Sequence, residues 1–438
     1  MIAASALAVT LLAAAGPPAS AGPWTLERTL EAARRMDPGI TAAHRAGEAG
    51  RAEGSAALAS LSPRITLDAG LTRGDDPALL FSQKLREGRF TSQDFALSSL
   101  NQPAPRSAWS WGVTLEQPLW NRGAEVTSPA IASHRRAAAS AGERASVADR
   151  LLAAAETYGR AVRARNALAA DSVAFAAAEE HRRAAVERFR QGQVPELDTL
   201  RATTRWAEAR SAWLTADKDL GVAMRRLALL VGEEVGAAEL ADLPEPQALS
   251  PPATEAQTPS PVRGELEAAR ERANALRVES SRAAFALLPS LNARLDVRQY
   301  RDPDSGEGER RFLLGVSASL PIWDGLLRIE ERRAARARAE EAEARAEDLR
   351  RDLSLQVLDA RGEASIALDR REAARMARAS SEEGLRLALA RYRAGLLPQT
   401  DLLAADAEAA RARLGAVDAD VDAVLAQYRY RHAMGVLE

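Results

Sequence analysis

The chain stops and restarts a helix in the same way at two distant places. RFRQGQVPELDTL begins at Arg188, and RYRAGLLPQTDLL begins at Arg391. The two stretches share a glycine, a proline and an aspartate, each 203 positions from its counterpart: Gly192, Pro195 and Asp198 match Gly395, Pro398 and Asp401. Glycine commonly ends a helix, and proline commonly opens the next one. The sequence therefore predicts an internal two-fold repeat in which each half contains a helical hairpin.

Both halves show the same order of predicted elements: a helix, two strands, a long helix and a shorter helix. Predicted helices cover residues 38–61, 129–191, 196–231, 262–288, 325–394 and 399–434. Charged residues make up 27% of the chain and aromatic residues only 4%, a composition typical of long, alanine-rich helices. At 1.5 Å per residue the first long helix spans roughly 95 Å, which is too long for a compact domain. We expect a mainly α fold of long antiparallel coiled-coil helices with a small β part.

Four segments alternate apolar and polar residues, as strands with one apolar face do. In the first segment the apolar side chains are Ile65, Leu67, Ala69 and Leu71. The opposite faces carry charge: Arg64, Asp68, Glu116, Arg294, Asp296 and Arg298. A transmembrane β-barrel with a wet lumen fits this pattern, but such barrels need about eight strands, so two or three copies must combine. A soluble four-stranded sheet packed on the helices is the alternative.

Aromatic residues at the strand ends fit the belt that membrane proteins place at the lipid interface. Two tryptophans stand two residues after a proline that ends a predicted strand, and two others lie on an apolar strand face: Trp120, Trp323, Trp109 and Trp111.

The N-terminal residues resemble an export signal, with an apolar run followed by the small-residue triplet Ala19-Ser20-Ala21. No lysine or arginine precedes this run, which is atypical, so the start codon is also in question. Beyond the signal, no uncharged stretch reaches the roughly 18 residues of a membrane-spanning helix.

Several classes of function are disfavoured. The net charge is −2 and the two signs are interspersed, so no nucleic-acid footprint is visible. The absence of cysteine excludes a thiol nucleophile, a thiolate metal site, a disulfide framework and a lipid anchor on cysteine. The histidines show no metal-ligand spacing, and no catalytic constellation stands out, so we expect neither an enzyme nor a cofactor: His44, His134, His181 and His432.

These observations divide the chain into eight segments. They are a signal peptide, first-repeat helices, a first strand pair with a long extracellular loop, a first hairpin, a connector, a second-repeat helix, a second strand pair and a second hairpin. Their bounds are 1–21, 22–62, 63–120, 121–235, 236–261, 262–288, 289–323 and 324–438.

The order of several motifs resembles that of the TolC-like outer-membrane efflux protein family. They are the opening WTLERTLEAARRMDPGITAA, the helix-to-strand LSPRITL and ALLPSLNARL, the strand-to-helix QPLW and LPIW, and the paired Gly-x-x-Pro-x-x-Asp turns. The resemblance covers nearly the whole mature chain. It implies a homotrimer in the outer membrane of a Gram-negative bacterium, with a shared 12-stranded transmembrane β-barrel and an α-barrel crossing the periplasm. Such a duct serves an inner-membrane transporter through a periplasmic adaptor, in drug or metal efflux or in type I protein secretion.

The resemblance also implies a gate at the paired turns, which would be the periplasmic tips and the adaptor contact. Carried over by position, Asp198 would accept a hydrogen bond from Tyr392, and Asp401 would form a ring of carboxylates at the entrance. Each aspartate also suits the first turn of a helix for dipole reasons alone. A second acidic position of the family is Ala404 here, and Asp406 lies on another helix face.

Two other classes remain open at this point. Long alanine-rich helices also suit a structural coiled-coil filament or scaffold, and a periplasmic adaptor has a helical hairpin. The strand pairs at matching points of both halves argue against them.

Overall fold

The computed structural model describes residues 22–247, 263–303 and 308–437. These residues fall into two compact units, and each unit takes segments from both sequence repeats. The first contains the described residues within 1–37, 151–250 and 362–429, and the second those within 38–150, 251–361 and 430–438. The predicted export signal at 1–21, and residues 248–261 of the predicted connector, lie outside the described residues.

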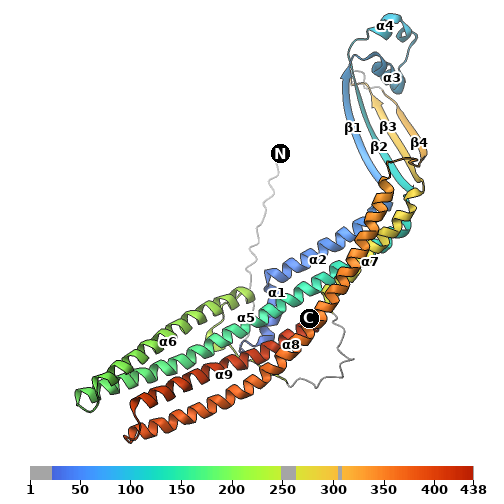
Figure 1. Ribbon diagram of the computed structural model, residues 1–438. Helices are drawn as coiled ribbons and strands as arrows, with labels where there is room; N and C mark the ends of the chain where they lie inside the picture. Colours follow the sequence, from blue (N-terminus) through green and yellow to red (C-terminus); the bar gives the residue numbers. More distant parts are fainter. Residues whose placement is uncertain (1–21, 248–262, 304–307, 438) are drawn as a thin grey trace, which may run out of the picture. The chain divides into compact units, whose positions relative to one another are not determined.

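The second unit contains a four-stranded antiparallel sheet in the order β1-β2-β3-β4 (Figure 1). The strands are β1 (Arg64–Gly74), β2 (Arg106–Trp120), β3 (Ser290–Arg301) and β4 (Arg310–Ser319). The four predicted strands are confirmed. Pairing of β2 with β3 joins the strand pairs of the two repeats into one sheet.

The register places apolar residues of all four strands in rows across one face. One row is Leu67, Val113, Val297 and Phe312, and the next is Ile65, Leu115, Leu295 and Leu314. Because side chains alternate between faces along a strand, the row between these two lies on the opposite face. It carries Thr66, Thr114 and Asp296, with Leu313 of β4 as an apolar exception. The predicted division into an apolar and a polar face is confirmed.

Long helices make up most of the rest of the chain, as predicted. Their bounds are α1 (Leu26–Met36), α2 (Pro38–Ala56), α5 (Ala124–Arg190), α6 (Glu196–Val231), α7 (Gly264–Arg282), α8 (Leu327–Arg393) and α9 (Gln399–Ala433). Short 3₁₀ turns, η1 (Ala57–Leu61) and η5 (Ala283–Leu287), lead from α2 and α7 toward the strands. In the first unit α5 runs beside α6, and α8 beside α9 (Figure 1). None of the described helices is long and apolar enough to cross a membrane.

Two predicted boundaries are wrong for identifiable reasons. The helix expected from Pro129 begins at Ala124, because a proline this close to the N-terminus removes only one hydrogen bond of the helical ladder. The fourth strand ends at Ser319, two residues short of its predicted end at Pro321, because a proline cannot donate a hydrogen bond to a sheet. In β2 the corresponding Pro118 stays in the strand, at a register shift.

Small side chains dominate the core of the first unit, which also contains buried aromatic residues. Tyr158 is fully buried, and its hydroxyl lies 2.7 Å from the carbonyl oxygens of Trp24 and Ala241. Burial raises the pKa of Tyr158 to about 12. Trp24 also pairs with Leu240 in a parallel bridge. Tyr158 on α5 thus holds the start of the described chain beside the connector.

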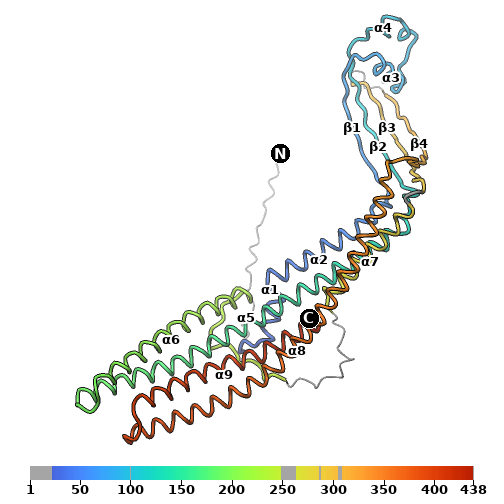
Figure 2. Tube along the Cα trace, viewed as in Figure 1, coloured from blue at the N-terminus to red at the C-terminus, as the bar shows by residue number. Residues whose placement is uncertain are grey.

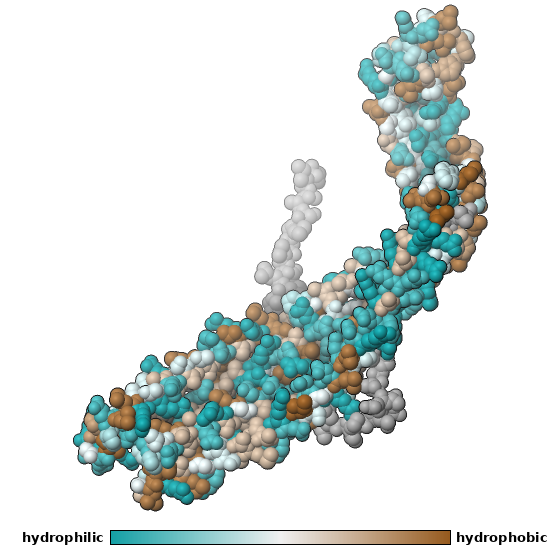
Figure 3. All heavy atoms as spheres, in the orientation of Figure 1, coloured by the Kyte–Doolittle hydropathy of each residue, from teal (hydrophilic) through white to brown (hydrophobic). Residues whose placement is uncertain are grey.

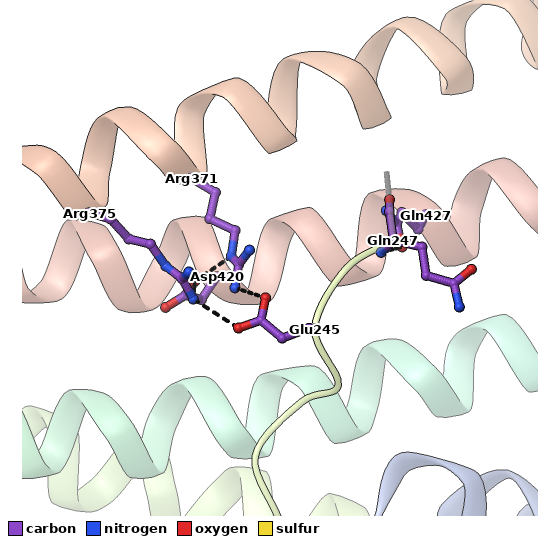
Figure 4. Close-up of polar contacts among 6 residues, drawn as sticks. All are labelled: Glu245, Gln247, Arg371, Arg375, Asp420 and Gln427. Carbon is purple, nitrogen blue, oxygen red and sulfur yellow. Dashed lines mark hydrogen bonds and ion pairs between the residues drawn. The ribbon is translucent and has the colours of Figure 1, made fainter. Parts of the chain in front are cut away.

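The connector is fixed to the second hairpin. Glu245 accepts hydrogen bonds from Arg371 and Arg375 of α8, and Asp420 of α9 accepts from the same two arginines (Figure 4). Gln247 follows, and its backbone N–H donates to the Gln427 side chain at 3.1 Å. The last described residues before the gap therefore lie across α8 and α9.

Histidines join helices of the second unit to α5. Three of them face a carboxylate at 2.6–2.7 Å: His44 with Glu143, His134 with Glu271 and His432 with Asp149. The His44 hydrogen bond, followed by that of Arg51, lowers the pKa of Glu143. Within the described ranges no group of three or more potential metal ligands comes together.

Candidate functional site

The paired turns have the same backbone geometry. Gly192 and Gly395 both have φ of 72°, in the left-handed region that glycine adopts without strain. After each long helix, the glycine N–H donates to the carbonyl oxygen three residues earlier. The N–H of the next residue donates to the carbonyl oxygen five residues before it. Both glycines therefore close the same helix-ending motif, and the prolines three residues later precede α6 and α9. The tube view shows the two sharp tips that result (Figure 2).

The predicted gate residues all lie near these tips. Asp401 is exposed and Asp198 is half-buried, each in the first turn of its helix. The Tyr392 ring lies under the Arg188 guanidinium, 4.8 Å from ring centroid to Cζ. Among the described residues of this single chain, no hydrogen bond joins Tyr392 to Asp198. The Asp198 carbonyl oxygen instead accepts from Gln399 Nε2 at 3.4 Å.

The tips also present apolar side chains to solvent. Hydrophobic atoms reach the surface at the ends of both hairpins (Figure 3). Leu396 is 77% exposed at the second tip, and other exposed side chains lie near the first: Phe189, Leu197 and Leu200. Exposed apolar patches on otherwise charged helices mark interaction surfaces.

Asp406, which the sequence places on another helix face from Asp401, lies against the neighbouring helix α6. Asp406 is buried, with only 2% of its surface exposed, and lies 3.5 Å from the guanidinium of Arg205 on α6. Arg205 lies seven residues after Asp198, and Asp406 lies seven residues after Gln399. This equal spacing could have identified Arg205 as the partner of Asp406.

The apolar face of the sheet is uncovered. Leu67 is 72% exposed and Val316 69%, and several neighbours are comparable: Ile65, Leu71, Phe312 and Leu314. A contiguous surface of large apolar side chains needs lipid or protein against it.

The opposite face forms a charged network. Arg294 lies 3.0 Å from Glu116, Arg298 lies 3.3 Å from Asp296, and Thr114 donates to Asp296 at 2.9 Å. Such a face is suited to water, so one side of the sheet requires an apolar environment and the other an aqueous one.

The predicted interface tryptophans differ in their surroundings. Trp109 and Trp111 are about two-fifths exposed on β2. Trp120 packs edge-on against Phe285, with ring centroids 6.5 Å apart. Trp323 is 77% exposed in the link from β4 to α8, where other apolar side chains gather (Figure 3).

The long connection between β1 and β2 is a small folded element. It contains α3 (Pro77–Glu87), η2 (Ser92–Phe95) and α4 (Leu97–Asn101). Phe90 lies between Phe81 and Phe95 in two edge-to-face contacts, at 4.6 and 5.0 Å. The loop therefore packs on itself through these three aromatic rings.

An ion cluster fastens this loop to the strand ends. Arg106, the first residue of β2, lies 3.0 Å from Glu87 of α3 and 2.7 Å from Asp302, which follows β3. Arg89 pairs with the same Asp302. The Glu87 side chain is 1% exposed. Sequence reasoning missed this cluster because its members are far apart in the chain.

The folded loop between β1 and β2 should become more stable as the pH falls toward 4.5, the ordinary pKa of a glutamate side chain. Burial, followed by the charge of Asp302, raises the pKa of Glu87 above 4.5, although Arg106, Arg89 and Lys84 oppose the shift. Between 4.5 and the raised pKa the folded loop binds the extra proton, so its stability decreases as pH rises. Hydrogen exchange of α3 should therefore quicken with rising pH beyond its intrinsic dependence, and Glu87→Gln should remove that excess.

Asp94, in the same loop, titrates at a lower pH than Glu87. Hydrogen bonds from the Lys84 side chain and the Thr91 backbone lower the pKa of Asp94 to about 2. Its contribution is lost only as pH falls below about 4. In Glu87→Gln, hydrogen exchange of α3 above pH 5 should follow its intrinsic pH dependence alone. If it still quickened beyond that dependence, Glu87 would not be the group responsible.

Fold and surfaces together define a class of protein. A duplicated chain joins a sheet with one apolar and one charged face to long helices that end in paired tips. This is the architecture of a membrane transport protein whose β part meets lipid.

The profile of the family described as outer membrane efflux protein matches residues 29–233 and 262–436. The chain belongs to the outer membrane efflux protein family, and the two matched regions confirm the two-fold repeat. It is a transport protein, not an enzyme, of the Gram-negative outer membrane, and its helices extend into the periplasm. A comparison with curated proteins found no match.

Solved structures share this fold at low sequence identity. A membrane protein from Pseudomonas aeruginosa is 23% identical with a TM-score of 0.77, and the match covers 94% of this chain and 93% of that one. The outer membrane protein VceC from Vibrio cholerae is 19% identical with a TM-score of 0.73, over 94% and 96% of the two chains. The CmeC outer membrane channel of Campylobacter jejuni is 16% identical with a TM-score of 0.75, over 94% and 85%.

Proposed function

We propose that three copies of this chain form one exit duct of a tripartite efflux pump or a type I secretion system. The observation that best supports this proposal is the sheet, whose uncovered apolar face suits lipid and whose charged face suits water. Within the described sheet, β1 and β4 each pair on one side only. If β1 of one copy pairs with β4 of the next, three copies supply twelve strands and leave no open edge, as lipid requires.

The helical hairpins extend the same lumen. Twelve strands enclose a water-filled channel, and the charged network of Arg294, Glu116 and Asp296 would line it. The long helices of three copies would then form an α-barrel that crosses the periplasm.

The exposed tips are the proposed contact with a periplasmic adaptor, which links the duct to an inner-membrane transporter. Gly192, Pro195, Gly395 and Pro398 fix the turns that present Leu396 and its neighbours. Specificity for drug, metal or protein cargo would come mainly from the transporter, since the duct offers no enclosed binding constellation among its described residues.

We further propose Asp401, Asp198 and Tyr392 as gate residues at the periplasmic entrance. Three Asp401 carboxylates close together would attract cations and resist anions. Asp401→Ala should lower the cation preference several-fold in planar bilayers. Tyr392→Phe should raise open probability if its hydroxyl reaches Asp198 in the closed trimer.

The same recordings test the duct itself. Wild-type protein should be a heat-modifiable trimer in the outer-membrane fraction and should conduct ions. Soluble protein or fibres would favour the scaffold alternative. Unchanged selectivity in Asp401→Ala and unchanged gating in Tyr392→Phe would remove the gate assignment while leaving the duct.

A further inference from the structure

Each repeat contains a link that leads from its second strand into its long helix. The first link, residues 119–124, runs from the end of β2 into α5, and the second link, residues 322–327, follows β4 and enters α8. Two consecutive residues of each link have positive φ: Arg122 at 47° and Gly123 at 75°, Gly325 at 67° and Leu326 at 70°. The two pairs are 203 positions apart, so both links follow one backbone path. Leu326 therefore adopts a left-handed conformation, which is strained for leucine, where the first link has glycine.

The first link is covered by the second repeat of the same chain. Because β2 pairs with β3, the end of β2 lies beside the start of β3 and beside η5, which precedes it. Phe285 of η5 packs edge-on against Trp120. A Cβ at Gly123 would lie 2.6 Å from the Phe285 ring, so only glycine leaves room for this aromatic side chain.

The second link has no such cover within the described chain. Trp323 is 77% exposed, Leu326 49% and Leu327 56%, and hydrophobic atoms gather at the surface where the strands meet the helices (Figure 3). The matching residues of the first link are buried or half-buried: Trp120, Gly123 and Ala124. The second link thus presents apolar side chains that are at least as large, at positions that the first link covers.

The internal repeat indicates what covers the second link. The turns η1 and η5 are both five-residue 3₁₀ turns that end two residues before a proline, Pro63 or Pro289, and they match at an offset of 226 positions. If β4 pairs with β1 of the next copy as β2 pairs with β3, η1 of that copy lies beside the second link. The residue of η1 that matches Phe285 is Ala59, which is exposed in the single chain.

The two equivalent contacts would then exchange a large and a small residue. Gly123 faces Phe285 within one chain, whereas Leu326 would face Ala59 of the next. We propose that the second link docks onto η1 of a second copy of this chain and that Leu326 fills the space that Ala59 leaves. The inference rests on the proposed trimeric duct and identifies a contact that joins its copies. Burial of Leu326 and Trp323 at this joint offsets the backbone strain at Leu326.

The test exchanges the side-chain sizes and measures how fast the purified trimer dissociates in detergent at a fixed elevated temperature. Leu326→Gly relieves the backbone strain but empties the contact, so dissociation should be at least tenfold faster. Ala59→Phe places an aromatic ring against Leu326, so dissociation should again be at least tenfold faster. The double variant, Leu326→Gly with Ala59→Phe, recreates the pairing of Gly123 with Phe285 and should return the rate to within about threefold of wild type.

A matched control lies in the same link. Ile322 is 94% exposed, and its counterpart Leu119 stays 50% exposed although the first link is covered. Ile322→Ala should therefore leave the dissociation rate within about twofold of wild type. If Leu326 contacts no neighbour, Leu326→Gly removes only strain and leaves the rate unchanged, which would overturn the proposal. A double variant no more stable than its weaker single variant would also overturn it.

A cysteine pair tests the contact without relying on stability. The chain has no cysteine, so introduced pairs have no background. In the first link a Cβ at Gly123 would lie 3.1 Å from the Phe285 Cβ, so the matching pair, Leu326→Cys with Ala59→Cys, is close enough for a disulfide. With diamide as the oxidant, it should give covalent trimers that survive boiling without reductant. Ile322→Cys with Ala59→Cys should give monomers.

The outcomes separate this contact from the duct itself. A disulfide within one chain, or no covalent dimers and trimers from the first pair, would overturn the proposed contact. Wild-type protein that forms no trimer would refute the duct. A stable trimer without coupling between Leu326 and Ala59 would refute only the contact.

Discussion

Leu67→Arg is expected to abolish assembly in the outer membrane. Leu67 lies in a row with Val113, Val297 and Phe312 that is apolar across all four strands. An arginine on the lipid face of a barrel costs about 2–4 kcal/mol near the bilayer midplane, and three copies would each carry that cost. Heat-modifiable trimer in the outer-membrane fraction should fall at least tenfold.

The control is the same substitution on the adjacent residue. Thr66 faces the polar side, in the row that contains Thr114 and Asp296. Thr66→Arg would face the wet lumen near a carboxylate, so trimer yield should stay within about twofold of wild type. Equal loss in both variants, or normal trimer with Leu67→Arg, would show that this face does not meet lipid.

Arg106→Met is expected to release the loop between β1 and β2. Without Arg106, the buried Glu87 carboxylate loses the partner that lies 3.0 Å away, and Asp302 keeps Arg89. Breaking a buried ion pair by removing one partner costs about 3–5 kcal/mol. Trypsin cleavage within α3, which contains Lys84 and Arg86, should become roughly a hundredfold faster while the trimer stays intact.

Two variants separate this effect from a general loss of charge. Arg73→Met, at the exposed end of β1, should leave cleavage unchanged. Adding Glu87→Gln to Arg106→Met should recover much of the protection, because no buried charge is then left unpaired. Cleavage of Arg106→Met at the wild-type rate would show that the cluster does not hold the loop.

Local patterns predicted much of the architecture. The expected helix at 196–231 coincides with α6, because Pro195 and Gly232 bound it and both signals act within one turn. Alternation predicted the faces of β1 to β4, because side-chain direction in a strand depends only on position along it. The tip turns followed from glycine and proline, whose backbone preferences are intrinsic.

Other features depend on residues that no local pattern connects. The folded loop between β1 and β2 contains the helices α3 and α4 and the 3₁₀ turn η2. The ion cluster that anchors it joins Glu87, Arg106 and Asp302 from separate segments. The end of β4 at Ser319 and the early start of α5 also went against expectation, since neighbouring structure decides whether a proline is tolerated. The gate residues were found near the tips, but Tyr392 lies against Arg188 in the single chain.

The sequence by itself determined the duplication, the long helices, the two-faced strands and the paired tips, because each follows from backbone preference and periodicity within a few residues. Only the tertiary structure decided that β2 pairs with β3, that Glu245 fastens the connector to α8, and that Arg205 of α6 lies 3.5 Å from Asp406 of α9. Periodicity specifies which face of an element is buried. The partner of that face depends on packing and charge between segments far apart in the sequence, such as those of Asp149 and His432, 283 residues apart, which only the folded chain brings together.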